Sequence, residues 1–313
     1  MSRSKISIIG GGFVGSTCAQ GLLNRDIGDM VLLDIEEDRV QGRALDLLQS
    51  SALTSASIQI NGTGDYRDIQ DSDIVVITAG QARRPGMSRD ELQNINAKIV
   101  VQACEQIKKQ APQSYVIVVT NPLDVMTYVA WKTLAFPSNR VIGMAGVLDS
   151  ARFKTFVAQE LNVSVKDVQA FVLGGHGDTM VLLPRLCHVG GIPLSELLSE
   201  ERISSLVERA KKGGAEIVSL LKTSSAYYAP ALSVVEMVEA ILKDQKRILP
   251  CSTLLKGEYG VKDLFMGVLC CLGAKGVEKI MEFSMSVEEK AQFQNSVLAV
   301  EKQVQQIRVL DDS

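Results

Sequence analysis

The chain has 313 residues, 46% of them hydrophobic and 22% charged, which excludes a disordered chain and leaves room for two globular domains. A net charge of −3 excludes the basic surface typical of nucleic-acid binding, and no apolar run is long enough to cross a membrane. The six cysteines form no CxxC pair, and His176 and His188 lack the spacing of metal ligands. We therefore expect reduced thiols, a cytoplasmic location and no metal site.

Short apolar runs alternate with longer helical patterns through the first half of the chain. Val/Ile-rich runs without polar alternation are typical of parallel strands that helices cover on both faces. The pattern predicts an α/β fold built on a doubly wound parallel sheet. The expected strands are residues 5–10, 30–34, 57–60, 73–78, 115–120 and 140–143, and the expected helices are residues 13–24, 35–51 and 88–112.

The pattern becomes less regular near residue 143, where we place a domain boundary. The first domain is then residues 1–143, and the second, of α+β class, is residues 144–313. For the second domain we expect a helix over 148–161, a strand, turn and strand over 171–184, mostly helix over 195–243 with a break at Gly213–Gly214, and short β-like runs and turns over 248–283.

Two helix starts have the spacing of a capping box, Ser88 with Glu91 and Ser286 with Glu289. The second of these opens the terminal helix. Its apolar residues recur at 4-3-4-3 spacing from Phe293 to Ile307, and we interpret this stripe as core packing.

The segment GGGFVG joins the first strand to the first helix and has the pattern G-x-G-x-x-G at Gly10, Gly12 and Gly15. Glycines permit a tight turn that brings backbone N–H groups to a pyrophosphate, and the helix N-terminus adds partial positive charge. Asp34 ends the second strand, where a carboxylate accepts hydrogen bonds from a ribose and repels a 2′-phosphate. The alternative is a simple turn with a capping aspartate, but this context favours a site for NAD over NADP.

A second candidate site centres on GGHGD, which places His176 between glycines just after an apolar strand. Imidazole exchanges protons near neutral pH, so a histidine exposed at such a turn is a candidate general acid and base. Asp149 and Arg152, in LDSAR, share one helical face and could orient that imidazole and bind an anion. From these residues alone, a structural histidine and a surface salt bridge stay open as alternatives. We interpret His188, in an apolar run, as structural.

The motifs GGGFVG, PGMSRDEL, TNPLD, GVLDSAR and GGHGDTM occur in this order and together resemble the lactate/malate dehydrogenase superfamily, most of all its lactate-dehydrogenase-like malate dehydrogenases. The resemblance covers nearly the whole chain. It implies an NAD-binding Rossmann domain, an α+β substrate domain, and reversible hydride transfer between NAD and a 2-hydroxy acid. The implied cofactor-binding residues are Gly10, Gly12, Phe13, Val14, Gly15, Asp34, Thr78, Ala79, Gly80, Asn96, Thr120 and Asn121.

The same resemblance implies roles for the residues of the second site. His176 matches the residue that transfers the proton, and Asp149 matches its carboxylate partner. Arg152 matches the arginine that binds the C1 carboxylate of the substrate through two parallel hydrogen bonds. Asn121 matches an asparagine near the substrate and nicotinamide, and its bond to Pro122 is expected to be cis.

Three arginines lie in the segment TAGQARRPGMSRD. By resemblance, Arg89 polarises the reacting carbonyl, and Arg83 pairs with the second carboxylate of a dicarboxylate, where lactate-type enzymes carry glutamine. Arg84 is interpreted as solvent-facing, although a one-residue slip would exchange it with Arg83. Gln81 and Ala82 depart from the apolar residue and proline of malate relatives, which leaves the stiffness of this loop open.

We therefore expect an NAD-dependent L-malate dehydrogenase that acts on malate and oxaloacetate. One alternative is an L-lactate or other 2-hydroxyacid dehydrogenase on the same fold, and another is a non-catalytic NAD-binding regulatory protein. The resemblance also implies a homotetramer or homodimer, with contact faces expected from the segment 35–51 and the C-terminal helix. Neither nucleic acid nor a membrane is expected as a partner.

Overall fold

The computed structural model describes residues 3–81 and 88–307 of the chain. Within these residues, nine strands form one mixed sheet in the order β14-β13-β12-β6-β5-β4-β1-β2-β3. The order reverses at β1, which pairs in parallel with β2 on one side and β4 on the other, so a crevice opens beyond the carboxyl ends of β1 and β4. The six parallel strands are β1 (Lys5–Ile9), β2 (Asp29–Leu33), β3 (Ile60–Thr63), β4 (Ile74–Ile77), β5 (Tyr115–Val118) and β6 (Val141–Gly143).

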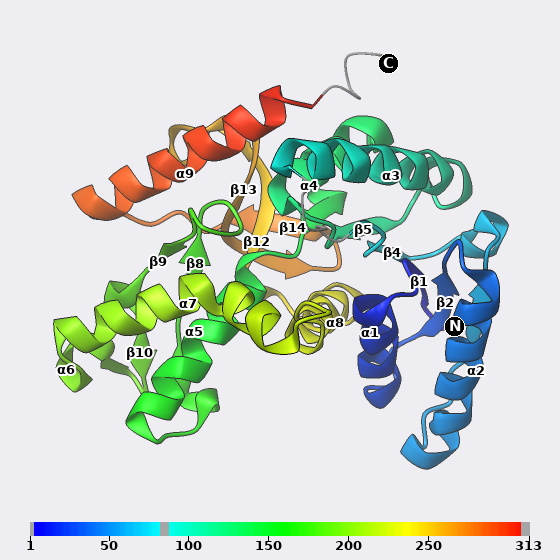
Figure 1. The fold of residues 1–313 in the computed structure, drawn as a ribbon, viewed down its shortest axis with the longest axis horizontal. Helices are drawn as coiled ribbons and strands as arrows, with labels where there is room; N and C mark the ends of the chain where they lie inside the picture. The colour runs from blue at the N-terminus through cyan, green and yellow to red at the C-terminus, as the bar shows by residue number, and fades with distance from the viewer. Residues whose placement is uncertain (1–2, 82–87, 308–313) are drawn as a thin grey trace.

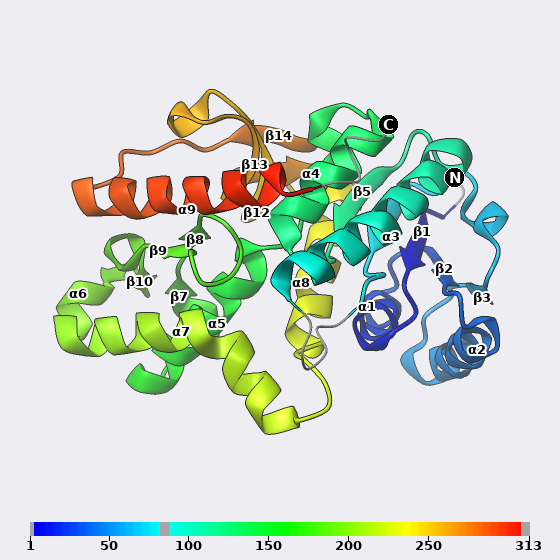
Figure 2. The same ribbon diagram turned by 45° about the horizontal axis from the view of Figure 1, so that its top comes forward.

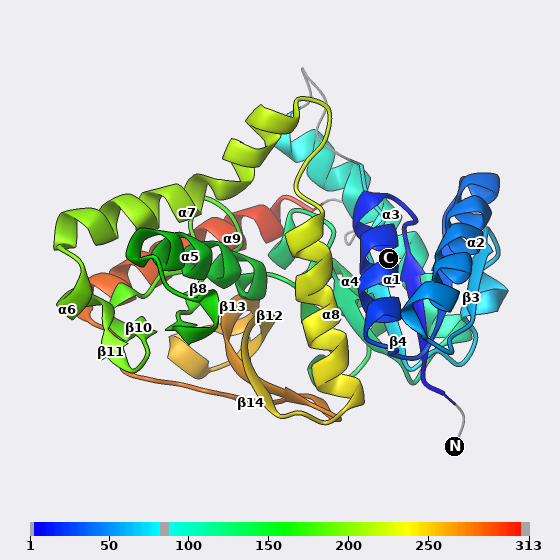
Figure 3. The same cartoon turned by 90° about the horizontal axis from the view of Figure 1, so that it is seen from below.

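Helices cover both faces of the parallel strands, as the apolar runs predict. One face packs against α1 (Phe13–Asn24), α2 (Glu37–Thr54) and α8 (Tyr228–Leu242), and α8 lies beside α1 although it comes from the second half of the chain (Figure 3). The other face packs against α3 (Arg89–Gln110) and α4 (Leu123–Leu134) (Figure 1).

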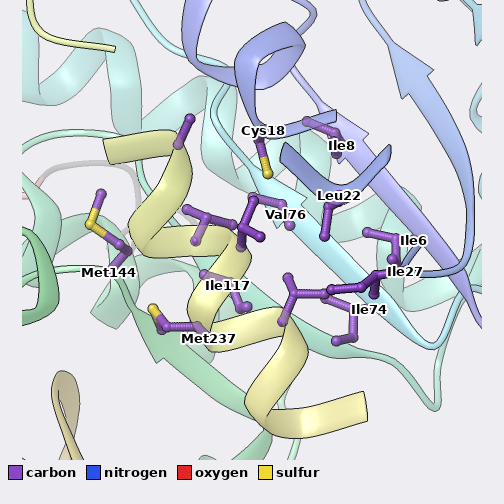
Figure 4. Packing of buried hydrophobic residues seen from close by; sticks show 14 of the residues in the cluster. Ile6, Ile8, Cys18, Leu22, Ile27, Ile74, Val76, Ile117, Met144 and Met237 are labelled. Atoms are coloured by element: carbon purple, nitrogen blue, oxygen red, sulfur yellow. The ribbon is translucent and has the colours of Figure 1, made fainter. Parts of the chain in front are cut away.

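Alternate residues of each strand enter the two cores. Ile8 and Val76 face α1 and α8, where Figure 4 shows them packed with Leu22 and Met237. Their neighbours in the strands belong to the opposite core with α3 and α4. The strands β2, β4 and β5 are apolar on both faces, so each is stable as a central strand of a covered sheet.

The second half of the chain extends the same sheet through β6. The strands β12 (Arg247–Lys256), β13 (Lys262–Gly273) and β14 (Gly276–Ile280) are antiparallel, and Ser252 of β12 pairs with Gly143 of β6. Here the sequence predicts only short β-like runs over 248–283, because Pro250 and nearby glycines interrupt the pattern. Both long strands are instead buried on both faces, which holds them in the sheet.

The remaining elements gather beside this extension (Figure 1). The helix α7 is continuous, so the break expected at Gly213–Gly214 is wrong; two glycines lower helix propensity without removing a backbone donor. The helix α9 crosses over β13 toward α4 (Figure 2). These elements are α5 (Gly146–Leu161), α6 (Leu194–Leu197), α7 (Glu200–Leu221), α9 (Val287–Gln305), β7 (Val168–Gln169), β8 (Val172–Leu173), β9 (Val181–Leu182), β10 (His188–Val189) and β11 (Ile192–Pro193).

Both predicted helix starts are confirmed. The Ser88 side chain accepts the Glu91 N–H, and Ser286 and Glu289 form a reciprocal capping box. The stripe of α9 that begins at Phe293 packs into the core, as expected. Among residues 3–81 and 88–307, no helix has the length and apolar character needed to cross a bilayer.

Two helical glycines have opposite surroundings, so the same substitution should change stability in opposite directions. A Cβ on Gly15 of α1 would overlap the Gly10 carbonyl oxygen, whereas a Cβ on exposed Gly42 of α2 would meet no atom within 4 Å. We expect Gly15→Ala to lower the free energy of unfolding by about 1–3 kcal/mol. Gly42→Ala should raise it by about 0.5–1 kcal/mol. Urea denaturation measures both, and equal effects would contradict the packing at the turn.

Candidate active site

The glycine turn after β1 presents the N-terminus of α1 at the crevice. Gly10 has φ +107°, and a Cβ there would lie 2.5 Å from the Ala79 nitrogen and 2.6 Å from Thr78 Oγ1. Thr78 Oγ1 in turn donates to the Gly10 carbonyl over 2.8 Å, which ties the turn to the end of β4. A Cβ on Gly12 would meet nothing within 4 Å, so open space lies in front of the first turn of α1. This cradle fits a pyrophosphate.

A carboxylate and a guanidinium flank this turn. Asp34 Oδ2 accepts the Gly11 N–H over 2.6 Å, and Oδ1 accepts the Glu36 N–H over 3.2 Å, so the carboxylate is held where β2 ends. Arg43, on α2, donates to the Gly11 carbonyl and lies 5.8 Å from the centre of the Phe13 ring. The sequence analysis did not identify Arg43, whose place beside the turn depends on how α2 packs.

The ends of β4 and β5 are joined by buried polar side chains. Asn96 Oδ1 accepts the Gln81 N–H, and its Nδ2 donates to the Asn121 carbonyl, each over 2.7 Å. Thr120 Oγ1 donates to the Ala79 carbonyl over 2.6 Å. The exposed Asn121 is therefore fixed through its backbone, with its amide at the carboxyl edge of the sheet. The side chains of Asn96 and Thr120 hold the backbone at this edge, so their hydrogen bonds to Gln81, Asn121 and Ala79 are structural.

The predicted histidine, aspartate and arginine meet in one cluster. His176 Nδ1 lies 2.8 Å from Asp149 Oδ2, and Arg152 Nη1 donates to Asp149 Oδ1 over 3.1 Å. The side chain of Asp149 is 1% exposed and that of His176 is 16% exposed. Burial alone would lower the pKa of His176, but the charge and hydrogen bond of Asp149 outweigh it, so the pKa is raised. With Nδ1 bound to Asp149, Nε2 is left for a substrate.

Arg152 lies against the two glycines of α7. A Cβ on Gly213 would come within 3.2 Å of Arg152 Cδ, and one on Gly214 within 3.6 Å of Nη2. Within the described part of the chain, the buried Nε of Arg152 has no hydrogen-bond partner. A buried guanidinium donor without an acceptor is the arrangement that an anion such as a carboxylate completes.

Two polar side chains that are not among the predicted site residues hold the backbone of the histidine loop, and a third, Ser252, binds one of them. Asp124 Oδ2 accepts the His176 N–H over 2.7 Å, and its Oδ1 accepts the Ser252 hydroxyl over 2.6 Å. Ser296 Oγ accepts the Gly175 N–H over 2.8 Å. Asp124 could have been identified from the sequence, because it belongs to the TNPLD motif and stands in the first turn of a largely apolar helix. Ser252 and Ser296 could not have been identified in this way, because their hydrogen-bond partners are distant in sequence.

The structure does not place every predicted residue. Arg83 and Arg84 lie outside the described residues, as does the side chain of Arg89. The bond between Asn121 and Pro122 is cis, as expected. Three more expected cofactor residues have clear positions, namely exposed Phe13, partly buried Val14 and exposed Gly80. His188 lies on β10 with Nδ1 3.1 Å from the Leu186 carbonyl, a structural position.

Phe13 also contacts the second half of the chain. Its ring stacks on Tyr227 with centroids 5.2 Å apart and an interplanar angle of 25°. Tyr227 in turn lies against Tyr228 at the start of α8, with ring centroids 4.2 Å apart. The crevice above the glycine turn is therefore bordered by residues from both halves of the sequence.

Comparisons with known proteins agree with this geometry. The family model for the NAD-binding domain of lactate/malate dehydrogenases matches residues 4–143, and the model for their α/β C-terminal domain matches residues 146–309. Malate dehydrogenases from Geobacillus thermodenitrificans and Heliobacterium modesticaldum are each 55% identical to this chain. Each alignment covers 96% of this chain and 97% of the relative.

Solved structures give the same result. Malate dehydrogenase from Cryptosporidium parvum superposes with a TM-score of 0.96 at 44% identity, covering 98% of this chain and 99% of that one. The lactate dehydrogenase of the same organism, solved with lactic acid and β-nicotinamide adenine dinucleotide, gives 0.95 at 42% identity and covers 100% and 99%. Backbone similarity therefore does not separate the two substrates.

The effect of Asp149 on His176 can be measured directly, because the chain has only two histidines. We expect Asp149→Asn to lower the pKa of His176, since the neutral amide no longer stabilises the imidazolium. Imidazole chemical shifts followed by NMR against pH report this pKa, and the His188 signals are the internal control. An unchanged His176 titration would contradict the pairing.

The same shift has a consequence for stability with a definite sign. Because the pKa of His176 is higher folded than unfolded, the pair stabilises the protein fully below the unfolded pKa of about 6.5. This contribution is lost as the pH rises through the folded pKa, and Asp149→Asn should remove it. Unfolding measured across that pH range tests the sign.

Proposed function

This chain belongs to the lactate/malate dehydrogenase family, and on that basis we propose that it is an NAD-dependent L-malate dehydrogenase. The observation that carries the proposal is the buried Asp149 carboxylate, which holds His176 and Arg152 together. Malate dehydrogenases 55% identical over nearly the whole chain support malate over lactate as the substrate. We also propose a domain boundary at residues 143 and 144, which the extents of the two family matches support.

The cradle between β1 and β4 would hold NAD, which supplies the hydride acceptor. The N–H groups of the turn at Gly10–Gly15 and the N-terminus of α1 would bind the pyrophosphate. Asp34 would accept hydrogen bonds from the adenosine ribose, and its charge would exclude a 2′-phosphate. The positions around Thr78, Asn96 and Thr120 would shape the rest of the cofactor site.

The substrate would be held and deprotonated by the cluster around Asp149. When malate is oxidised, His176 Nε2 takes the proton of the 2-hydroxyl, and the Asp149 carboxylate stabilises the imidazolium that forms. In the reverse direction the imidazolium returns the proton to the ketone oxygen. The planar guanidinium of Arg152 binds the C1 carboxylate, and the Asn121 amide lies beside the reacting carbon.

Two arginines near the start of α3 complete the proposal. Arg89 would polarise the reacting carbonyl, and Arg83 would pair with the second carboxylate of oxaloacetate. A charge at Arg83 selects a dicarboxylate, because leaving one buried partner unpaired costs about 3–5 kcal/mol.

Substitution of Arg83 tests the choice of substrate. We expect the unmodified protein to prefer oxaloacetate over pyruvate by at least about a hundredfold in kcat/KM, roughly 2.7 kcal/mol of discrimination. Arg83→Gln should lose most of this preference because the second carboxylate has no partner. NADH oxidation with the two substrates side by side gives the ratio.

Arg84→Gln is the matched control, since it removes the same charge one residue away. It should keep the preference; if instead it alone loses it, the two arginines exchange roles. Equal rates on both substrates in the unmodified protein would overturn the malate assignment.

Substitution of His176 tests the proposed acid and base. His176→Asn should lower kcat by at least about a hundredfold. Undiminished turnover in that variant would show that His176 is not the acid and base of the reaction.

We also propose a homodimer or homotetramer whose interface includes α2. Leu45 is 56% exposed and Leu53 is 89% exposed on this helix, and Tyr228 and Leu232 are exposed on α8. Exposed apolar side chains of this size are typical of protein interfaces. The apolar stripe of α9 packs within the chain, whereas Leu298 on the same helix is exposed.

Charge on α2 should therefore dissociate the assembly. We expect sedimentation of the unmodified protein at two or four times the chain mass, and a shift to smaller species for Leu45→Lys combined with Leu53→Lys. Val287→Lys, at an exposed position of α9, is the control and should leave the mass of the assembly unchanged. A monomeric unmodified protein would exclude the proposed interface.

A cytoplasmic location is also proposed. All six cysteines fall within the described residues and are free thiols, and five of them are buried. Free thiols in such number are typical of proteins from reducing compartments.

A further inference from the structure

Asp124 is a second buried carboxylate beside His176, and the chemistry proposed above does not use it. It stands in the first turn of α4, and its exposure is 4%. Its contact with the histidine differs from that of Asp149, because it accepts the backbone N–H of His176 over 2.7 Å and does not bind the ring. Its other oxygen accepts the Ser252 hydroxyl over 2.6 Å.

A charged carboxylate at this buried position lowers the stability of the fold more than a neutral hydrogen-bond acceptor would. Burial raises the pKa of Asp124, which shows that the surroundings disfavour its charge, although the bonds from Ser252 and His176 oppose this effect. The N-terminal turn of α4 also favours a negative charge. A neutral residue could accept the same N–H without the cost of a buried charge.

The loop that carries His176 has other anchors, which come from β13 and α9. Gly174 exchanges backbone hydrogen bonds with Gly267 of β13, and Gly175 donates to Ser296 of α9. Asp124 holds His176 itself, from the helix that follows Asn121. It therefore connects the histidine to the carboxyl edge of β5, where Asn121 lies.

Three charged side chains act on the imidazole of His176, namely Asp149, Arg152 and Asp124. Asp149 and Arg152 face it from α5, and Asp124 faces it from α4. Arg152 pairs with Asp149, so those two charges offset each other at His176. No lysine or arginine of the described residues forms an ion pair with Asp124, whose charge therefore acts on the imidazole without a compensating cation.

We propose that Asp124 is a positioning residue for His176, which sets the place of the imidazole against Asp149 and the substrate and uses its charge to favour the imidazolium. The inference rests on the proposed role of His176 as acid and base. It adds a residue on which the proton transfer depends although that residue touches neither substrate nor cofactor.

Asp124→Asn separates charge from geometry. The amide oxygen can still accept the His176 N–H, and the amide nitrogen can donate to Ser252 Oγ, so the variant should fold and lose only the charge. Reduction of oxaloacetate needs protonated His176, so kcat/KM falls as the pH rises through its pKa. In the variant we expect this fall at lower pH, with kcat/KM about threefold or more below the unmodified protein on the alkaline side and near normal on the acid side. The His176 NMR titration should move in the same direction.

Asp124→Ala tests the anchor, because it removes the acceptor as well as the charge. A displaced imidazole should lower kcat by about a hundredfold at every pH while the KM for NADH stays unchanged. Ser252→Ala is the control, since it keeps the bond from His176 to Asp124, and its kcat should stay within about threefold of normal. If Asp124→Ala does not fold, Asp124→Asn and the NMR titration still decide the question.

An unmodified pH profile and His176 titration in Asp124→Asn would overturn the electrostatic role. Normal kcat with a lowered Tm in Asp124→Ala would reduce Asp124 to a structural residue. His176→Asn separates these failures from failure of the acid–base role proposed for His176. If that variant keeps its turnover, the proposed role of His176 fails, whereas if it is inactive and both Asp124 variants behave normally, only this inference fails.

Discussion

The site depends on one buried carboxylate that makes two charge-assisted contacts. Asp149 binds the His176 ring through one oxygen and the Arg152 guanidinium through the other, with almost no exposure to water. In such an environment a carboxylate without partners would be strongly disfavoured, so its neighbours are held as firmly as it is. The imidazole and the guanidinium are thereby fixed relative to each other. Under the proposed function, proton transfer would begin from this defined geometry.

The fold supplies this arrangement through the carboxyl edge of one sheet. The glycine turn, Asp34, and Asn121 each follow a parallel strand, and helix α5, which carries Asp149, follows β6. The second half of the chain then adds three antiparallel strands to the same sheet, so the histidine loop is attached to β13 through the backbone of Gly174. Cofactor cradle and acid–base cluster are therefore parts of one hydrogen-bonded framework, although the sequence divides into two domains.

The sequence predicted five of the six parallel strands closely and placed the third at 57–60, whereas β3 is Ile60–Thr63. It also identified His176, Asp149 and Arg152, because each of these features leaves a local signal. Unbroken apolar runs, the glycine pattern and the i, i+3 spacing of Asp149 and Arg152 can all be recognised within a few residues. The contacts of Ser252 and Ser296 could not be predicted, since each joins segments more than 100 residues apart. The long strands β12 and β13 were underestimated for a related reason. Their stability comes from pairing with each other and with β6, which no local pattern in 248–283 records.

The surroundings of Arg152 show why the helix break expected at Gly213–Gly214 is wrong. Two adjacent glycines would ordinarily indicate a helix end, yet α7 continues through Gly213 and Gly214, and their missing side chains leave room for the Arg152 side chain. The helix gives up intrinsic propensity there, and the buried Nε is left without a partner among the described residues. Both features weaken the free protein. Under the proposed function a bound carboxylate would supply the missing acceptor, so the free energy lost at this donor would be recovered on substrate binding.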